Sequence, residues 1–416
     1  MTQLTAAKKI LIYGYGIEGK STAAFLKSKD VNYFEIHDDN IKEYSSKKEL
    51  DEYDVIIVSA GINREKVFPE NLWSKCTSNT ELFFHNLSPI NRRKTIGITG
   101  TKGKSTTAKF IYELLQNCEK KVEVAGNYGK GLLDVLDQMD DLEFLVIELS
   151  SYQLAYLNRS VHLALCTNLF EDHVDWHGGI DPYHKAKANM WAHQTPSDFL
   201  FIPYRYCSNP FFETPGEKIT SGSLYHQFFP DETCIWHAPH YLQNLGLAHQ
   251  LYRHLDLGEI AFKKTCMEFE PLPHRMSFVR ELNGVTFYDN AIGCNPHATI
   301  ADIGFFKEKL GCLILGGVDR GNNFASVFEA IHKHHSPAYI IIQRSDASDK
   351  IKSILKENYP RIQFTVASTL EEAVNVGYEK TLKNKVCLLS PACASFDRYK
   401  NYEDKGDAFV KYVNSL

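Results

Sequence analysis

Short apolar runs alternate with longer amphipathic stretches along this chain. Runs such as KILIY at 9–13 and FLVIE at 144–148 predict buried strands. Because helical stretches separate these runs, the order predicts α/β architecture with parallel sheets. Further strands are expected at 33–36, 55–58, 95–98, 122–125, 163–168, 285–288, 312–315, 339–342, 363–366 and 386–389. Helices are expected at 21–28, 108–115, 241–255, 298–309, 324–333, 348–358 and 369–380.

Two proline-containing segments, at 89–93 and 271–273, interrupt the alternation. A chain of 416 residues is also too long for one ordinary core. We therefore expect three domains, at 1–92, 93–271 and 272–416. The stretch 199–239 is rich in aromatic residues, Pro and Ser, and there we expect only edge strands and loops.

Composition is that of a soluble globular protein, with 44% hydrophobic and 23% charged residues. The net charge of −5 argues against a general nucleic-acid binder. No signal peptide and no run of about eighteen apolar residues is present, so we expect a cytoplasmic protein without membrane insertion. We also expect a monomer. The ten cysteines form no CxxC pair, which favours reduced thiols over disulfides or zinc.

The sequence KTIGITGTKGKSTT at 94–107 combines a strand, a glycine loop and the start of a helix, which is the arrangement of a phosphate-binding loop. Lys104 would reach the terminal phosphates and Ser105 would hold Mg²⁺. The usual spacing requires glycine where Ile98 stands, so this is a variant loop, and an ordinary glycine turn is the alternative. The expected ATP-binding residues are Gly100, Thr101, Lys102, Gly103, Lys104, Ser105 and Thr106.

A second glycine motif, GYGIEG at 14–19, follows the first strand, and Asp38 lies about twenty residues further on. By itself this pattern predicts a dinucleotide site and an NAD-dependent oxidoreductase. Two features argue against that reading. The unit ends near Arg92, which is short for a dehydrogenase domain, and a second phosphate loop begins immediately afterwards.

Further motifs lie along the rest of the chain. They are GN at 126–127, ELSSYQL at 148–154, NLFEDHVDWH at 168–177, YHKAK at 183–187, LPHR at 272–275, LGGVDRG at 315–321 and SPACASFDRYKNYEDKG at 390–406. Together with TGTKGKS they resemble the Mur ligase family, the ATP-dependent ligases that build the peptide of bacterial peptidoglycan. The resemblance covers the whole chain, and ELSSYQL and the last motif are its most specific parts.

The resemblance implies a Rossmann-like first domain for the UDP-substrate, a central ATPase-type domain and a Rossmann-like third domain for the amino acid. Within the family, the motifs are most similar to those of members that add D-glutamate to UDP-N-acetylmuramoyl-L-alanine through an acyl phosphate. ATP and Mg²⁺ are the implied cofactors. The implied residues on the UDP-substrate are Gly14, Gly16, Ile17, Gly19, Asp38, Ser59, Gly61 and Asn127.

Catalytic and metal-binding roles also follow from the resemblance. Glu148 and Ser105 are expected to bind Mg²⁺, for which oxygen ligands are suited, and His173 is expected at a second metal. Lys187 matches a lysine that is typically carbamylated, which requires an unprotonated amine. The alternatives are a helix cap for Glu148, a packed loop histidine for His173 and an exposed helix lysine for Lys187, with Lys185 the solvated one of the pair.

The remaining implied residues lie towards the C-terminus. For ATP they are Asn244, Arg275, Asp289 and Asn290. For D-glutamate they are Arg320, Ser395 and Tyr402. The alternatives are a solvated loop arginine at 320 and a helix cap at Ser395.

Some positions depart from the family pattern. Lys102 replaces an asparagine, and Tyr241 replaces another, where it either stacks on adenine or packs. The segment DNAIGCN at 289–295 stands where these ligases usually have NDSKATN, so Ile292 replaces a lysine. Three alternatives to a D-glutamate-adding ligase remain. The segment DNAIGCN suggests a relative that adds a different amino acid; the others are the NAD-dependent oxidoreductase and a non-catalytic nucleotide-binding scaffold.

Overall fold

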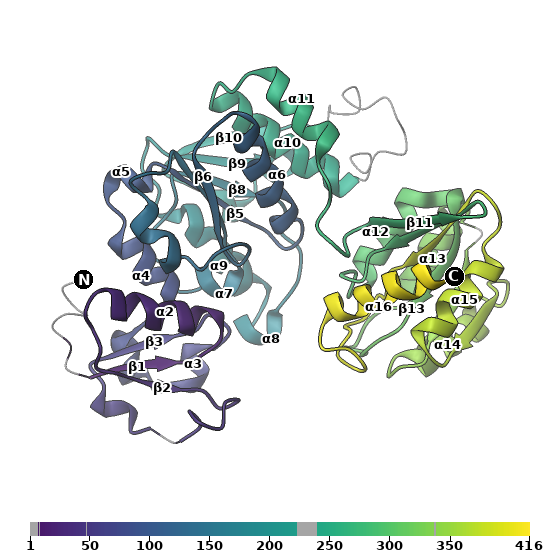
Figure 1. Ribbon diagram of the computed structural model, residues 1–416, viewed down its shortest axis with the longest axis horizontal. Helices are drawn as coiled ribbons and strands as arrows, with labels where there is room; N and C mark the ends of the chain where they lie inside the picture. Colours follow the sequence, from purple (N-terminus) through teal and green to yellow (C-terminus); the bar gives the residue numbers. More distant parts are fainter. Residues whose placement is uncertain (1–6, 8, 47, 223–238, 337) are drawn as a thin grey trace. The chain divides into compact units, whose positions relative to one another are not determined.

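The structure is a computed structural model that describes residues 7, 9–46, 48–222, 239–336 and 338–416. Its strands form three sheets, which follow one another along the chain (Figure 1). The α/β class predicted from the sequence is confirmed. Residues 223–238, part of the aromatic stretch expected to form edge strands and loops, lie outside the described residues.

The first sheet is parallel, with the strand order β2-β1-β3-β4. Its strands are β1 (Ile10–Tyr13), β2 (Phe34–His37), β3 (Val55–Val58) and β4 (Cys76–Thr77). The helix α2 (Ile17–Ser28) begins inside the glycine motif. A Cβ atom at Gly19 would lie 2.2 Å from the carbonyl oxygen of Gly14, so only glycine allows this close turn.

The central sheet is also parallel, with the order β10-β9-β8-β5-β7-β6. Its strands are β5 (Thr95–Thr99), β6 (Val122–Gly126), β7 (Phe144–Glu148), β8 (Leu163–Cys166), β9 (Phe199–Pro203) and β10 (Glu217–Ser221). Its helices include α6 (Lys104–Asn117), α7 (Ser151–Leu154), α8 (Val174–His177) and α9 (Ile180–Ala192). The loops after β5, β7 and β8 therefore meet at one edge, where parallel α/β sheets bind their ligands.

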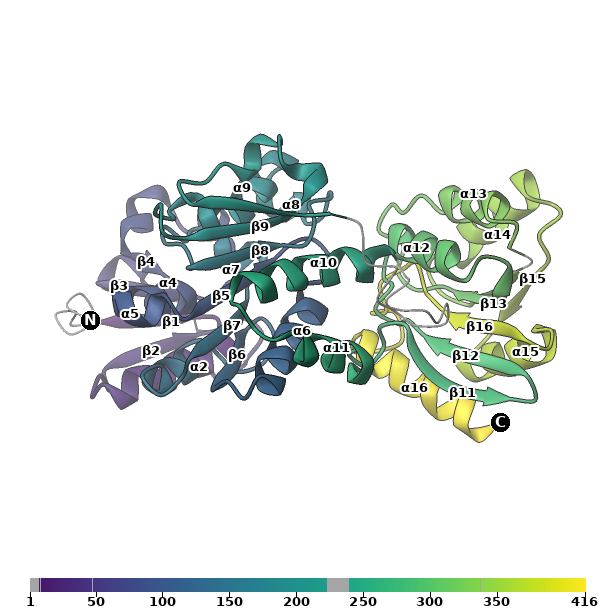
Figure 2. The same cartoon turned by 90° about the horizontal axis from the view of Figure 1, so that it is seen from above.

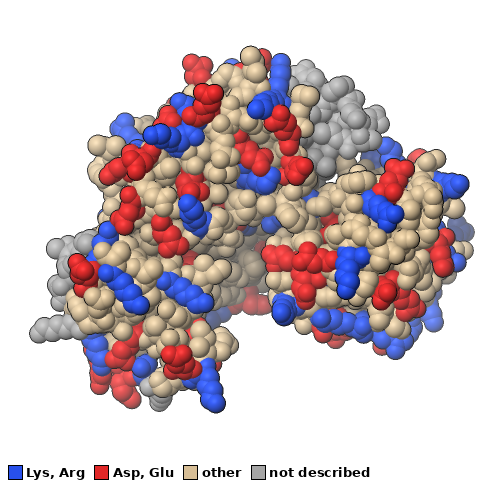
Figure 3. Space-filling view, viewed as in Figure 1, with Lys and Arg blue, Asp and Glu red and all other residues tan. Residues whose placement is uncertain are grey.

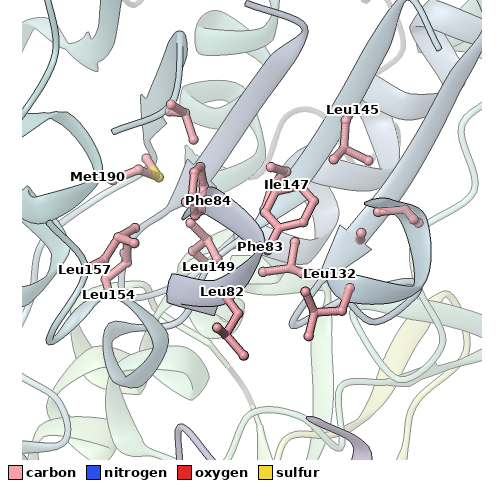
Figure 4. Close-up of a cluster of buried hydrophobic side chains, with 14 of the residues drawn as sticks. Leu82, Phe83, Phe84, Leu132, Leu145, Ile147, Leu149, Leu154, Leu157 and Met190 are labelled. Atoms are coloured by element: carbon pink, nitrogen blue, oxygen red, sulfur yellow. The ribbon is translucent and has the colours of Figure 1, made fainter. Parts of the chain in front are cut away.

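The first two sheets share a hydrophobic core. Leu82, Phe83 and Phe84 of α4 (Asn79–Asn86) belong to the same buried cluster as Leu145 and Ile147 of β7 (Figure 4). The short helix α5 (Pro89–Arg92) occupies the segment where we expected a polar boundary. Both sheets accordingly belong to one compact unit, formed by residues 1–228 and 243–269.

The third sheet lies in a second compact unit, formed by residues 229–242 and 270–416. Its order is β11-β12-β16-β13-β14-β15, and only β11 is antiparallel to its neighbour. The strands are β11 (Ser277–Leu282), β12 (Val285–Asp289), β13 (Leu310–Leu315), β14 (Tyr339–Gln343), β15 (Phe364–Ala367) and β16 (Lys385–Leu389). The helices are α12 (Pro296–Phe306), α13 (Ala325–Lys333), α14 (Ser348–Asn358), α15 (Leu370–Lys380) and α16 (Tyr402–Ser415). Figure 2 shows α13 and α14 on one face of this sheet and α15 and α16 on the other.

Two further helices, α10 (Pro239–His254) and α11 (Glu259–Glu268), lie between the second and third sheets in the sequence. None of the helices in the described part of the chain is long and apolar enough to cross a membrane. Acidic and basic side chains are interspersed on the face presented in Figure 3.

Candidate active site

The glycine loop after β5 has backbone angles that only glycine readily adopts. Gly100 has φ +145° and Gly103 has φ +84°. A Cβ atom at Gly100 would lie 2.0 Å from Thr167 Oγ1, and one at Gly103 would lie 2.3 Å from Asn244 Nδ2. The loop is therefore packed closely against the turn after β8 and against the side chain of Asn244 from α10.

This loop leads directly into α6, whose first residue is Lys104. Backbone N–H groups at the start of a helix, together with its dipole, favour an anion at this point. The Lys104 ammonium donates to the carbonyl oxygens of Gly100 at 3.1 Å and Thr101 at 3.2 Å. Its positive charge thus lies on the loop itself, and Ser105 and Thr106 follow in the first turn.

Asn168, two residues after the end of β8, fixes the shape of the loop. Its Oδ1 accepts a hydrogen bond from the Lys102 backbone N–H at 2.8 Å, and its Nδ2 donates to the Lys102 carbonyl at 2.9 Å. The Lys102 ammonium forms an ion pair with Asp172 at 3.0 Å. The lysine that replaces the family's asparagine therefore links the phosphate loop to the segment that carries His173.

Lys187 on α9 is buried, with an exposed fraction of 1%. Its Nζ donates to the Gly100 carbonyl at 2.9 Å and lies 4.8 Å from the centre of the Tyr183 ring. Burial, reinforced by the nearby Lys104, lowers the pKa of the Lys187 amine well below its ordinary value. The alternative of an exposed helix lysine is wrong for Lys187, whereas Lys185 is exposed as expected.

Glu148 ends β7 and is fully buried, with an exposed fraction of 0%. Its Oε1 accepts a hydrogen bond from Asn127 Nδ2 at 2.9 Å, while its Oε2 has no hydrogen-bond partner among the described residues. The helix-cap alternative is wrong, because Ser150 and Gln153 form the capping box of α7. A buried carboxylate oxygen without a partner is suited to a cation.

His173 is the residue immediately before α8 and has a left-handed backbone, with φ +53°. Its ring centre lies 4.9 Å from that of Tyr152 and 6.2 Å from that of Tyr183. Burial, partly opposed by Asp172, lowers the pKa of His173, which favours the neutral imidazole that binds metals. Nearly half of its side chain remains exposed, with a fraction of 46%.

A preformed metal cluster is not present in the described residues, since no three His, Cys, Asp or Glu side chains converge there. The donors that are present still fit Mg²⁺, because Glu148 Oε2 is a buried oxygen without a hydrogen-bond partner among the described residues. Ser105 lies in the first turn of α6, directly after the glycine loop whose Gly100 carbonyl accepts from the Lys187 amine.

Two loops of the first sheet lie together at its carboxyl edge. Asp38 Oδ2 accepts from the Tyr15 backbone N–H at 2.7 Å, which lowers the pKa of this carboxyl group. Ser59 Oγ donates to the Gly14 carbonyl at 2.8 Å. Ile17, beside the glycine motif, is 83% exposed. Gly16 and Gly61 have open space around them, so a ligand can approach both backbones.

Two of the residues predicted for ATP in the second unit form hydrogen bonds with buried side chains. Asp289 Oδ2 lies 2.6 Å from His274 Nδ1, and Asn290 Nδ2 donates to Asp302 at 2.5 Å. Asp302 is buried, and burial raises its pKa to about 7. Tyr241 packs rather than presenting its ring, since it is 2% exposed and its hydroxyl donates to the Arg275 carbonyl at 3.1 Å.

The residues predicted for the amino acid follow β13 and β16. Arg320 is exposed, and its guanidinium carbon lies 5.6 Å from the Phe396 ring centre. Ser395 is 2% exposed and its Oγ has no partner among the described residues, so the helix-cap alternative is wrong for this hydroxyl. Tyr402 begins α16, and Ile292 is half-buried in the loop after β12.

Sequence reasoning missed several residues that hold these loops. Glu18 accepts from the Ala60 backbone N–H and from Gln153 Nε2, both at 2.8 Å, and so joins three motifs. His274, whose pKa is raised chiefly by its hydrogen bond to Asp289, fixes the segment that carries Arg275. An acidic residue inside a glycine motif expected to bind a diphosphate was the available signal for Glu18.

Comparison with known proteins places these features in a family. Residues 98–218 match the Mur ligase middle domain. The UDP-N-acetylmuramoylalanine–D-glutamate ligase of Natranaerobius thermophilus is 30% identical over 95% of this chain and 90% of its own length. The ligase of the same name from Aquifex aeolicus is 30% identical over 97% and 98%, respectively.

Two solved structures have the same fold at low sequence identity. Thermotoga maritima UDP-N-acetylmuramate–alanine ligase has a TM-score of 0.59 at 14% identity, with 98% of this chain and 99% of that chain covered. The MurF ligase of the same organism, in complex with ADP, has a TM-score of 0.57 at 15% identity, with 100% and 97% covered. With relatives at 30% identity over nearly its full length, the chain belongs to the Mur ligase family.

Proposed function

We propose that the chain is an ATP-dependent ligase that joins D-glutamate to UDP-N-acetylmuramoyl-L-alanine in peptidoglycan precursor synthesis. The observation that carries this proposal is the full-length match, at 30% identity, to ligases named for this reaction. The glycine loop, with Lys104 and the buried Lys187 on its carbonyl groups, supports it. The NAD-dependent oxidoreductase explains none of these relatives.

The reaction activates the L-alanine carboxylate as an acyl phosphate by transfer of the terminal phosphoryl group of ATP. The amine of D-glutamate then attacks the acyl carbon, the amide bond forms, and inorganic phosphate leaves. Phosphoryl transfer of this kind is mainly positioning and charge neutralisation. The loop N–H groups of residues 100–105 and the start of α6 bind the phosphates, and Lys104 neutralises the transferred group. Asn244, with a buried Oδ1 that lacks a partner among the described residues, is proposed for the adenine edge.

Mg²⁺ would be held by Glu148, Ser105 and, at a second position, His173, where it would neutralise charge on the phosphate oxygens. Burial of Lys187 and His173 favours the neutral forms of these two side chains. Burial lowers the pKa of the Lys187 amine and so favours the neutral form, which can react with CO₂, release a proton and become an anionic oxygen ligand. The lowered pKa of His173 leaves its imidazole available as a donor.

Each of the three sheets is assigned to one ligand of the reaction. We assign residues 1–92 to the UDP-substrate, 93–271 to ATP and 272–416 to D-glutamate. For the amino acid we propose the Arg320 guanidinium for one carboxylate, the Ser395 hydroxyl as a donor and Tyr402 as a packing surface. Because Ile292 removes a cation from this pocket, we expect a high Michaelis constant for D-glutamate.

An ADP-release assay that omits one substrate at a time tests the proposal. ADP should form only when ATP, UDP-N-acetylmuramoyl-L-alanine and D-glutamate are all present. An amino-acid panel of L-alanine, glycine, L-glutamate, D-glutamate, D-aspartate and L-lysine tests specificity. Preferential turnover of a neutral or basic member would leave a Mur ligase that adds another amino acid, and no turnover at all would favour a nucleotide-binding scaffold.

A further inference from the structure

The segment that carries His173 is attached to the first sheet through α8. The carbonyl oxygen of Trp176 accepts a hydrogen bond from Asn63 Nδ2 at 2.8 Å, and the Trp176 indole N–H donates to the Gly61 carbonyl at 3.1 Å. The Lys66 ammonium donates to the Asp175 carbonyl as well. One residue of α8 is thus held at both its backbone and its side chain by the loop after β3.

That loop contains Ser59 and Gly61, which we assign to the UDP-substrate. Asn63 is fixed within it, because its Oδ1 caps α3 (Arg64–Val67) by accepting from the backbone N–H groups of Glu65 and Lys66. The Tyr156 hydroxyl also donates to this oxygen, at 3.3 Å. Asn63 therefore uses its oxygen to shape its own loop and its amide hydrogens to hold α8.

At the other end of α8, His173 has a backbone conformation that a non-glycine residue rarely adopts. Such a conformation is strained in a non-glycine residue and persists only where the surroundings impose it. The His173 carbonyl accepts from the backbone N–H groups of Trp176 and His177, each at 3.2 Å, so the anchored helix imposes this conformation. The Tyr152 ring contacts both His173 and Trp176, with both pairs of ring centres 4.9 Å apart.

We propose that Asn63 and Trp176 are positioning residues that couple occupation of the UDP-substrate loop to the metal-binding geometry of His173. The inference rests on the proposed function for the identity of the substrate. A ligand that orders Ser59–Gly61 fixes the acceptor of the Trp176 indole, and α8 transmits that order to His173 over a few residues. Coupling of this kind is reciprocal, so the metal must also tighten binding of the UDP-substrate.

Two conservative variants isolate the link. Asn63→Asp keeps the oxygen that caps α3 but removes the donor to Trp176. Trp176→Phe keeps an aromatic ring against Tyr152 but removes the indole N–H. Trp73→Phe is the matched control, because the Trp73 indole also donates to a backbone carbonyl of the first domain, that of Phe68 at 3.0 Å, away from α8.

The first measurement is equilibrium Mn²⁺ binding, followed by electron paramagnetic resonance of the free ion, in the presence of a non-hydrolysable ATP analogue. Adding UDP-N-acetylmuramoyl-L-alanine should tighten Mn²⁺ binding about fivefold in the wild type and in Trp73→Phe, which is within the usual range of coupling between sites. In Asn63→Asp and Trp176→Phe the effect should fall below about twofold. Their kcat should decrease while the KM for ATP stays unchanged.

Wild-type coupling in both variants, or no coupling in the wild type, would overturn the proposal. So would equal loss of coupling in Trp73→Phe, since that would indicate a general effect on the first domain. Failure of the proposed function is a separate result, because it would appear as absence of product from the wild type with D-glutamate. Thermal unfolding midpoints within a few degrees of the wild type ensure that the variants are folded.

Discussion

Lys187 places an amine where its charged form is unfavourable. Lys187 is a buried residue of α9, and its Nζ contacts the phosphate loop. The positive charge of the nearby Lys104 further opposes its protonation. If Lys187 had a purely structural role, replacing it with methionine would change the activity of the protein little. A lysine that must be neutral in order to react with CO₂ loses its function entirely. A chemical role for Lys187 therefore predicts a large loss of activity on substitution, whereas burial alone predicts a small one.

We expect Lys187→Met to fold and to lose activity by on the order of a hundredfold or more, which is comparable to the loss of a preorganised charge. In Lys187→Ala, which leaves space for it, a short carboxylic acid should restore part of the activity by supplying the missing oxygens. With ¹³C-bicarbonate, the wild type should give a carbamate resonance that the variant lacks. Lys185→Met is the control, because Lys185 is exposed on the same helix. Full activity of Lys187→Met would contradict the carbamate role.

Lys104 is predicted to act only on the transferred phosphoryl group. Lys104→Ala should lower kcat by on the order of a hundredfold, because the transition state loses its fixed cation. Binding of the UDP-substrate, measured by calorimetry, should remain at the wild-type level, since Lys104 is not among the residues assigned to that substrate. Lys109→Ala removes a lysine of the same helix that pairs with Glu113 and should be nearly neutral. Near-wild-type turnover of Lys104→Ala would contradict the assignment of this loop to ATP binding.

At the element scale, the sequence predicted strands better than it predicted connections. The buried runs at 55–58 and 144–148 match β3 and β7 at both ends, because apolar runs flanked by polar residues define such strands closely. The strand β11 was missed because its residues alternate weakly between half-buried and exposed. The helix α16 was missed because it contains Gly406, which usually argues against a helix interior.

The structure shows why that glycine is present, and no sequence rule contains the reason. A Cβ atom at Gly406 would lie 2.0 Å from His274 Nδ1, on a segment distant in the sequence. Long-range links at the candidate site are equally hidden, such as those from Glu18 to Ala60 and to Gln153, across 42 and 135 residues. Motifs identified the chemical groups, but the partners that position them arise only on folding.

The pair of His274 and Asp289, which joins the LPHR segment to the end of β12, predicts a pH dependence of stability. The hydrogen bond to Asp289 raises the pKa of His274 above its unfolded value of about 6.5. The stabilisation is therefore fully present below pH 6.5 and is lost as the pH rises through the folded pKa. His274→Gln should remove this contribution.

Urea unfolding of wild type and His274→Gln at a series of pH values measures this contribution. The difference in stability between the two should be largest near pH 6 and should shrink towards pH 8.5. Comparison with the variant is necessary because burial lowers the pKa of other histidines, including His177 and His184, which act in the opposite direction. A difference that is constant with pH would show that His274 is not protonated in the folded state.

At the scale of the whole molecule, the crossings between the two compact units that fall within the described residues are at 242/243, in α10, and at 269/270. Arg275 lies in the second unit and the phosphate loop in the first. The family resemblance implies that Arg275 binds ATP, and this expectation predicts that ligand binding brings the two units closer together. Hinges made of a few residues at element ends are the usual means of such closure.

X-ray scattering should therefore show a smaller radius of gyration when an ATP analogue and UDP-N-acetylmuramoyl-L-alanine are both bound. Arg275→Ala should reduce this compaction, because the guanidinium supplies the charge that holds the second unit on the phosphates. Arg253→Ala is a suitable control. It removes an exposed arginine of α10 that belongs to the first unit, whereas Arg275 belongs to the second. Identical scattering with and without saturating ligands would mean that the phosphates are neutralised from the first unit alone, and Arg275 would then lose its proposed role.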